Sequence, residues 1–309
     1  MNRRERQTAT AESGKRNVSA HPVEDIAAAL NAVIGQLRAG HYLEAQLLCQ
    51  RALEQSPEHP ELLHLMALVC FNAEQFEHAV EWASRASQRV PKPAYFTTLG
   101  TALLNLKRHD EGVKAFEQAA LLKPDDAGPW NNLGNACIEA GRQTQAMESF
   151  DRALEIDRRH LDATFKTGVI LQQRGRYQEA LDYLNRCNAL LPDQVAILVA
   201  RAETLSALNR LEEALSDNRR AQTLDPQNPH IRNNLAQSLM RLRRYDEALI
   251  WLDRALAIQP DFVEALDNKA SVLTELHRVA DAAAGYESAQ AIDPNHAETK
   301  SNLGFCNGP

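Results

Sequence analysis

Apolar residues recur along the chain with the spacing of α-helix faces. The stretch 130–158 begins with apolar or small residues at i, i+3, i+4 and i+7, which form one helix face: Trp130, Leu133, Gly134 and Cys137. Gly141 ends this run, because glycine readily enters the left-handed conformation that terminates helices. A second apolar face with the same period follows in residues 146–154. The stretch is therefore predicted to be a hairpin of two helices that must bury its apolar faces against neighbours.

Prolines mark the neighbours at intervals of 34 residues, with one step of 33 and one gap of 68: Pro57, Pro91, Pro124, Pro192, Pro226, Pro260 and Pro294. Arg158 stands where the proline of the gap would be. Small residues occupy three columns, 24, 12 and 5 residues before each mark, as Gly134, Ala146 and Ala153 do before Arg158. Small residues allow two helices to cross closely, and proline ends the second helix through its missing N–H and ring clash. The pattern predicts eight consecutive hairpins.

A period of 34 residues with these columns resembles the tetratricopeptide repeat family. The resemblance covers roughly residues 24–305. It implies an all-α fold, a right-handed superhelical solenoid of antiparallel helix hairpins with about eight repeats and a terminal helix. The expected repeats are 26–59, 60–92, 93–126, 127–160, 161–194, 195–228, 229–262, 263–296 and a partial one at 297–305.

Residues 1–22 lack this period and carry five Lys or Arg against two acidic residues. We expect a disordered basic tail there, and one solenoid over residues 23–309. A short electrostatic anchor for an anionic partner is the alternative interpretation of the tail. The ninth helix is expected either to cap the array or to lead into further sequence.

Composition restricts the classes of binding partner and the cellular compartments that suit the chain. The formal net charge of −7 disfavours nucleic acid as the main partner. No apolar run approaches the ~20 residues that a membrane helix needs. The five cysteines form no C-x-x-C pair, and several fall in apolar columns: Cys49, Cys70, Cys137, Cys187 and Cys306. They are interpreted as reduced core residues, which favours a reducing compartment and a cytoplasmic location.

Catalytic and metal-binding motifs are not found in the sequence. There is no phosphate-binding G-x-x-x-x-G-K-[ST], no G-x-G-x-x-G, no H-E-x-x-H and no G-x-S-x-G. The ten histidines are scattered, and His59 and His64 lack further ligands at metal spacing. We therefore predict that the chain is not an enzyme, and expect no catalytic residue, no metal site and no cofactor.

The sixth repeat departs from the pattern. Arg201 occupies a column of leucines, and Asn218 occupies a column of aromatic residues. One interpretation is that Arg201 extends its charge to water from a slightly loosened repeat. The other is a polar seam that flexes or holds a ligand. Lys269 repeats the exception in the eighth repeat.

A polar column on the first helices is the strongest functional signal. It lies 26 residues before each mark and holds Asn31, Leu65, Thr98, Asn132, Lys166, Ala200, Asn234 and Asn268, with Asn302 continuing the series. This column is expected to face the concave groove, where an Asn amide can pair with both the N–H and the C=O of an extended peptide. The predicted peptide-binding residues are Asn31, Asn131, Asn132, Asn135, Lys166, Asn233, Asn234, Asn268 and Asn302. The alternative is that these residues serve packing or face solvent.

The column resembles the Asn ladder of the superhelical tetratricopeptide arrays in O-linked N-acetylglucosamine transferases, where the repeats recruit protein substrates. Lys166 and Ala200 interrupt the ladder here. The resemblance leaves two functions open: a non-catalytic scaffold for protein or peptide partners, or the substrate-recruiting arm of a bacterial glycosyltransferase whose catalytic domain is absent from these residues. Self-association through the terminal repeat is a further alternative.

Overall fold

The computed structural model describes residues 26–296, 299 and 302. Within these residues it contains sixteen α-helices and no strand, which confirms the all-α prediction. The predicted basic tail at 1–22 and most of the partial repeat at 297–305 lie outside the described residues. The chain divides after Lys123 into two compact units, a division that the sequence period does not mark. The assignment of residues 23–309 to one array with the repeat limits given above stays a prediction.

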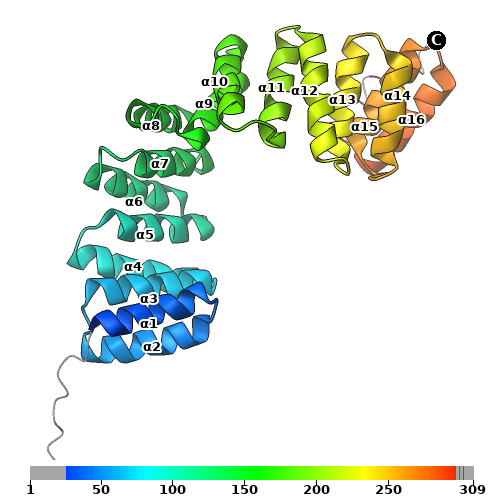
Figure 1. Cartoon of the computed structure of the whole chain (residues 1–309). Helices are drawn as coiled ribbons and strands as arrows, with labels where there is room; N and C mark the ends of the chain where they lie inside the picture. Colours follow the sequence, from blue (N-terminus) through cyan, green and yellow to red (C-terminus); the bar gives the residue numbers. More distant parts are fainter. Residues whose placement is uncertain (1–25, 297–298, 300–301, 303–309) are drawn as a thin grey trace, which may run out of the picture. The chain divides into compact units, whose positions relative to one another are not determined.

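The first unit, residues 1–123, contains three hairpins, named here repeats 1 to 3. Their helices follow one another as stacked antiparallel pairs in the blue to cyan part of Figure 1. The helices are α1 (Ile26–Arg38), α2 (Tyr42–Gln55), α3 (Pro60–Asn72), α4 (Phe76–Arg89), α5 (Pro93–Asn105) and α6 (His109–Leu122).

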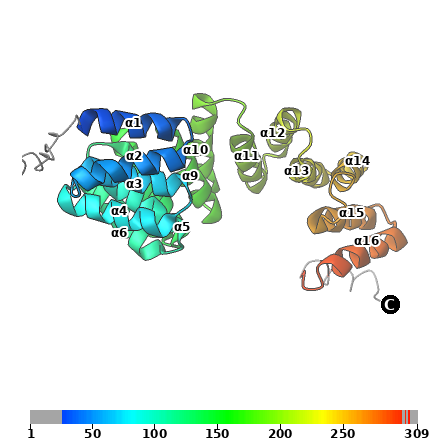
Figure 2. The same cartoon turned by 90° about the horizontal axis from the view of Figure 1, so that it is seen from below.

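The second unit, residues 124–309, contains repeats 4 to 8. Figure 2 shows the last of these pairs following one another in chain order. The helices are α7 (Ala127–Glu139), α8 (Gln143–Ile156), α9 (Leu161–Gln173), α10 (Tyr177–Leu190), α11 (Val195–Ala207), α12 (Leu211–Leu224), α13 (Pro229–Arg241), α14 (Tyr245–Leu256), α15 (Val263–Glu275) and α16 (Val279–Ile292).

The three columns of small residues are buried in every repeat except at Ala52, which is half-buried. The columns 24 and 12 residues before each mark meet where the two helices of a hairpin cross, as Gly112 does beside the carbonyl of Gly100. In repeats 3 and 4 an aromatic ring lies directly against a glycine of the first helix. A Cβ on Gly100 would come within 2.6 Å of the Phe116 ring, and one on Gly134 would overlap the ring of Phe150. The close helix crossing predicted from the columns is confirmed.

The two helices of a repeat play different roles within each unit. First helices of consecutive repeats contact one another, as α1 does α3 and α13 does α15. Among the described residues, second helices of consecutive repeats make no such contact. We call the surface formed by the first helices the first-helix face, and the opposite surface the second-helix face. The second-helix face therefore has gaps between its helices, floored by a first helix.

Every hairpin turns through one residue in the left-handed conformation. The eight positions are equivalent, and φ lies between 58° and 75° at each of them: Gly40, Glu74, Lys107, Gly141, Gly175, Asn209, Arg243 and His277. In repeat 4 the Gly141 N–H donates to the carbonyl of Ile138, and the Arg142 N–H donates to the carbonyl of Cys137. Gly141 thus ends its helix as the sequence predicts. Five of the eight turns achieve the same geometry without glycine.

The turns should respond in opposite directions to glycine and alanine. A residue with a Cβ costs about 1–2 kcal/mol in the left-handed conformation. Glycine avoids this cost but loses more conformational entropy on folding, so its net stabilisation is smaller. Lys107→Gly and Arg243→Gly, both at exposed positions, are expected to stabilise their units by about 0.5 kcal/mol. Gly141→Ala should destabilise by about 1 kcal/mol. Urea unfolding followed by circular dichroism measures all three, and a stabilising Gly141→Ala would contradict this account of the turns.

Candidate functional site

The nine residues predicted to bind a peptide are spread over five first helices and the segment after α16. Asn31 lies on α1 and is exposed, and Asn302 is half-buried beyond the last helix. The other seven belong to the second unit, on α7 (Asn131, Asn132, Asn135), α9 (Lys166), α13 (Asn233, Asn234) and α15 (Asn268). The second unit therefore carries most of the candidate site.

On α7, two of the three Asn residues hold the next repeat rather than facing solvent freely. The amide nitrogens of Asn131 and Asn135 both donate to Oδ2 of Asp162 on α9, each at 2.9 Å. A carboxylate only accepts hydrogen bonds, so Asp162 fixes which way both amides point. Their side-chain oxygens are buried without a hydrogen-bond partner. Asn131 and Asn135 are thus engaged in joining repeat 4 to repeat 5.

On α13 and α15 the same kind of bond joins repeat 7 to repeat 8. The Asn268 amide donates to Oδ1 of Asn233 over 2.8 Å, and Asn233 is buried. One residue before Asn268, the buried Asp267 accepts a hydrogen bond of 2.9 Å from the Thr299 hydroxyl. His296 lies 3.1 Å from the second oxygen of the same carboxylate. A row of polar bonds therefore connects successive first helices at this end of the chain.

The first unit uses different side chains in the equivalent positions. Nε2 of His64 on α3 lies 2.9 Å from the hydroxyl of Thr98 on α5, and the imidazole packs against the ring of Tyr95. Burial, with a smaller contribution from the Lys92 charge, lowers the pKa of His64 to about 4. The imidazole is therefore neutral at pH 7, as a packed residue of the repeat interface would be. Lys92 itself forms an ion pair with Glu61 at 3.0 Å.

Three of the seven residues on α7, α9, α13 and α15 remain available to a partner. Asn132, Lys166 and Asn234 are half-buried on α7, α9 and α13, and their side chains form no hydrogen bond within the described part of the chain. Asn132 and Asn234 each follow a neighbour, Asn131 or Asn233, whose side chain is bonded to the next repeat. The first-helix face of the second unit thus presents two free amides and one free ammonium group beside residues that are held in place.

In repeat 6 the polar residues pair with one another. Arg201 binds Asp217 through two hydrogen bonds, Nε to Oδ2 at 2.7 Å and Nη2 to Oδ1 at 2.6 Å. The two side chains are only 19% and 9% exposed, so a simple extension of Arg201 to water is not what the structure shows. Asn218 donates to the Ser238 hydroxyl at 3.0 Å and to the backbone carbonyl of Asn234 at 3.3 Å.

Lys269, the second exception to the leucine column, is also paired. Its ammonium group lies 2.7 Å from Asp253 on α14. Both basic residues of this column therefore find carboxylates on second helices. The sequence holds both partners, but only the packing of the hairpins brings them together.

The cysteines of the described residues are buried. Cys49, Cys70, Cys137 and Cys187 are in no disulfide bond, and Cys306 lies outside the described part of the chain. Burial raises the pKa of Cys49 to about 12 and those of Cys70 and Cys187 to about 11, so these three are poor nucleophiles at neutral pH. A search of residues 26–296, 299 and 302 finds no group of three His, Cys, Asp or Glu placed to hold a metal.

A membrane-crossing helix is not found either. Among the described residues, none of the helices combines the length and the apolar character that a bilayer requires.

The sequence matches two models of protein families. The model described as tetratricopeptide repeat matches residues 97–160, 171–229, 193–261 and 233–297, which together make up more than half of the chain. The model described as anaphase-promoting complex, cyclosome, subunit 3 matches residues 38–119. Among curated proteins, no sequence matches the chain.

Solved structures with the same fold share few identical residues with the chain. YrrB, described as a TPR protein with an unusual peptide-binding site, is 22% identical over 61% of this chain and 97% of its own, with a TM-score of 0.53. The APC/C hetero-tetramer Cut9–Hcn1 is 16% identical over 99% of this chain, with a TM-score of 0.61, and the match spans 59% of that chain. A tetratricopeptide repeat protein from Parabacteroides merdae is 14% identical over 81% of this chain and 99% of its own, with a TM-score of 0.61. At these identities the likeness concerns the fold.

Neighbouring Asn residues on α7 should differ in their effect on stability. Asn131→Ala removes a hydrogen bond to a carboxylate, so it should cost about 1.5 kcal/mol. Asn132→Ala removes no bond within the described residues and should stay within about 0.5 kcal/mol of the parent. Urea midpoints of the two variants test this difference, and equal midpoints would show that the Asp162 contact does not hold the repeats.

Proposed function

Because the chain belongs to the tetratricopeptide repeat family, we propose that it is a non-catalytic scaffold whose first-helix face binds segments of protein partners. The observation that carries the proposal is the set of free polar side chains on this face in the second unit, Asn132, Lys166 and Asn234. A half-buried polar group without a hydrogen bond has already lost part of its hydration on folding. Less desolvation is therefore needed when a ligand forms a hydrogen bond to it, so the bond contributes more to binding.

The chemistry of these three side chains suits a peptide backbone. A free Asn amide offers two donors and an acceptor, and a peptide in extended conformation exposes both an N–H and a C=O at each residue. Such bonds recognise the backbone whatever the side chains are. Lys166 adds a positive charge on α9, which would favour an acidic side chain at that point of the bound segment.

The hydrogen-bonded Asn residues hold in place the helices that carry the free side chains. Asn131 and Asn135 fix α7 against α9 through Asp162, and Asn233 fixes α13 against α15 through Asn268. A binding group held on a rigid element loses less conformational entropy when its ligand arrives. Of the six other Asn residues, four are interface residues in this proposal (Asn131, Asn135, Asn233, Asn268), Asn31 is exposed, and Asn302 is half-buried after α16.

The relatives are consistent with this role. YrrB is described as having an unusual peptide-binding site, and Cut9 forms a hetero-tetramer with Hcn1. We propose protein partners for this chain too, and propose against nucleic acid because the net charge is −7. A cytoplasmic location is part of the same proposal and is supported by the four buried cysteines, which are in no disulfide bond.

A capture experiment with a matched control tests the proposal. The full chain is immobilised, partners are crosslinked from a cell lysate, and the bound proteins are quantified by mass spectrometry. The test variant carries Asn132→Ala, Lys166→Ala and Asn234→Ala. The control variant carries Arg152→Ala, Gln178→Ala and Ser216→Ala, three exposed positions on the second helices α8, α10 and α12. Both variants lose one positive charge, so the comparison isolates the face.

The proposal predicts that specific partners bind the parent and the control variant and are lost, by about tenfold or more, from the test variant. Circular dichroism has to show that both variants remain folded. If the same partners persist on the test variant and leave the control variant, binding uses the second-helix face and the proposal is wrong.

A further inference from the structure

A cleft of about 370 Å³ opens on the second-helix face of the first unit. Its floor is α5, and its walls are the second helices α4 and α6 of repeats 2 and 3. Apolar side chains line its interior, and polar and charged ones surround them: Val80, Phe96, Leu99, Leu103 and Ala115, with Ser84, Arg108, Glu111, Lys114 and Gln118. The cleft is thus an apolar hollow with a polar rim.

Ala115 stands in a column that three other repeats fill with a large aromatic residue. The equivalent residues are Leu48, Trp82, Ala115, Ser149, Tyr183, Asp217, Trp251 and Gly285. Where the column holds an aromatic residue, an arginine three positions later covers the ring. The guanidinium carbon lies 4.6 Å from the ring centroid for Arg85 on Trp82, 5.1 Å for Arg186 on Tyr183 and 4.7 Å for Arg254 on Trp251.

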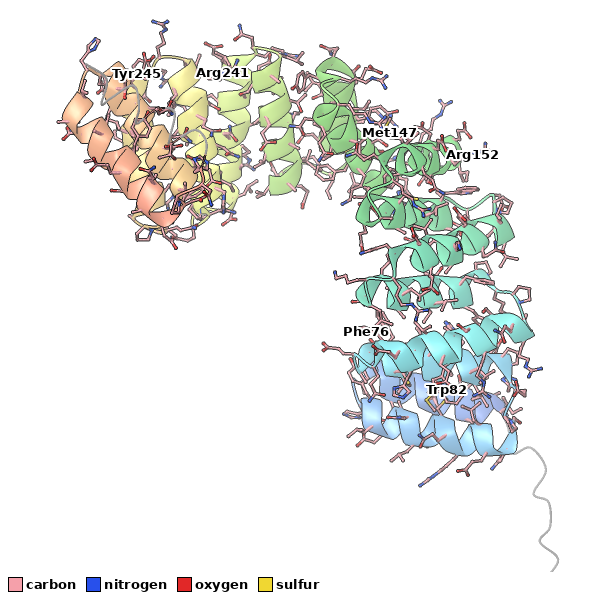
Figure 3. The ribbon with its side chains drawn as sticks, turned by 180° about the vertical axis from the view of Figure 1, so that it is seen from behind. Phe76, Trp82, Met147, Arg152, Arg241 and Tyr245 are labelled. Atoms are coloured by element: carbon pink, nitrogen blue, oxygen red, sulfur yellow. The ribbon has the colours of Figure 1, made fainter. Side chains whose placement is uncertain are left out.

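Two of these aromatic residues, Trp82 and Trp251, pack against core clusters that include equivalents of the cleft's apolar residues. Trp251 packs against the cluster that contains Leu215, Leu235 and Leu239. By repeat position these three correspond to Val80, Leu99 and Leu103 of the cleft. In the first unit Trp82, which is labelled in Figure 3, packs against a core cluster of repeats 1 to 3 that contains Met66 and Cys70, the equivalents of Leu99 and Leu103. The chain itself therefore shows which side chain fits over this surface.

Two further repeats use ion pairs in place of the ring. In repeat 6 the column holds Asp217, which binds Arg201 above the first helix. In repeat 8 it holds Gly285, and the Lys269–Asp253 pair lies in the equivalent cleft. In repeat 3 the column holds Ala115. The first helix carries Leu99 at the position where repeats 6 and 8 carry a basic residue. The apolar surface at Ala115 thus lacks the ring found in repeats 2, 5 and 7 and the ion pair found in repeats 6 and 8.

We propose that this cleft is a docking site for an aromatic side chain, tryptophan or tyrosine, presented by a partner protein. The incoming ring would take the place that Trp82 and Trp251 take in their own repeats. The exposed Lys114 at the rim would supply the cation that Arg85 and Arg254 supply there. Aromatic anchors in apolar pockets with polar rims carry much of the affinity of protein interfaces.

The occupant is assigned to another protein because no tryptophan of this chain is exposed. Its three tryptophans, Trp82, Trp130 and Trp251, are all half-buried in their own repeats. The segments outside the described residues contain neither tryptophan nor tyrosine. The proposal is independent of the peptide site above, since it concerns the other face and the other unit.

A titration with N-acetyl-tryptophanamide tests the cleft directly. The full chain is labelled at Leu and Val methyl groups and observed by NMR. We expect saturable shifts of the methyl signals of Val80, Leu99 and Leu103, and none with N-acetyl-alaninamide. A variant with Ala115→Trp and Gln118→Arg copies the Trp82–Arg85 arrangement into repeat 3. It should unfold at a higher temperature than the parent and bind the probe at least about tenfold more weakly.

Ala115→Leu serves as a second filled variant, because leucine already occupies this column at Leu48. It covers the case in which the tryptophan variant does not fold, and it too should weaken binding of the probe. The proposal is overturned if the parent shows no saturable shifts at these methyl groups. It is equally overturned if a folded, filled variant binds the probe as the parent does.

Discussion

The close crossing of two helices at small residues is the constraint on which the rest of the structure depends. Gly100 and Gly134 let the rings of Phe116 and Phe150 lie against the first helix, where any Cβ would overlap them. Because the same three columns are small in every repeat, each hairpin has nearly the same shape. Stacking such hairpins places all first helices on one face of a unit and leaves gaps between the second helices on the other. Both proposed binding surfaces follow from this arrangement.

The two faces differ in the kind of group that is left without a contact inside the chain. On the first-helix face polar side chains join neighbouring repeats, and a few of them, such as Asn132 and Asn234, find no partner. On the second-helix face, apolar side chains of the first helices lie at the bottom of the gaps. An aromatic residue such as Trp82 packs against them in some repeats, and an ion pair such as Arg201–Asp217 lies there in others. One face therefore offers hydrogen bonds, and the other offers apolar surface where the covering residue is small.

The sequence predicts the fold well because the fold is encoded locally and repeated. The small columns and the turn at Gly141 each act within one hairpin, so a single repeat contains the information. The site is predicted less completely, because its contacts join residues of different repeats. Asn131 reaches Asp162, 31 residues away, and which of two adjacent Asn residues is bonded depends on side-chain direction. Arg201 and Asp217 lie in the same repeat, but their pairing also depends on side-chain direction, because it requires both side chains to point into the gap beside α11.

The most direct test of the account asks which face of the second unit touches a partner. A photo-crosslinking amino acid is placed either at Lys166 on α9 or at Arg152 on α8, which is labelled in Figure 3. The full chain is irradiated in lysate, and crosslinked proteins are identified by mass spectrometry. The account predicts specific crosslinks from position 166 and none from position 152. Crosslinks to specific partners from position 152 alone would contradict it.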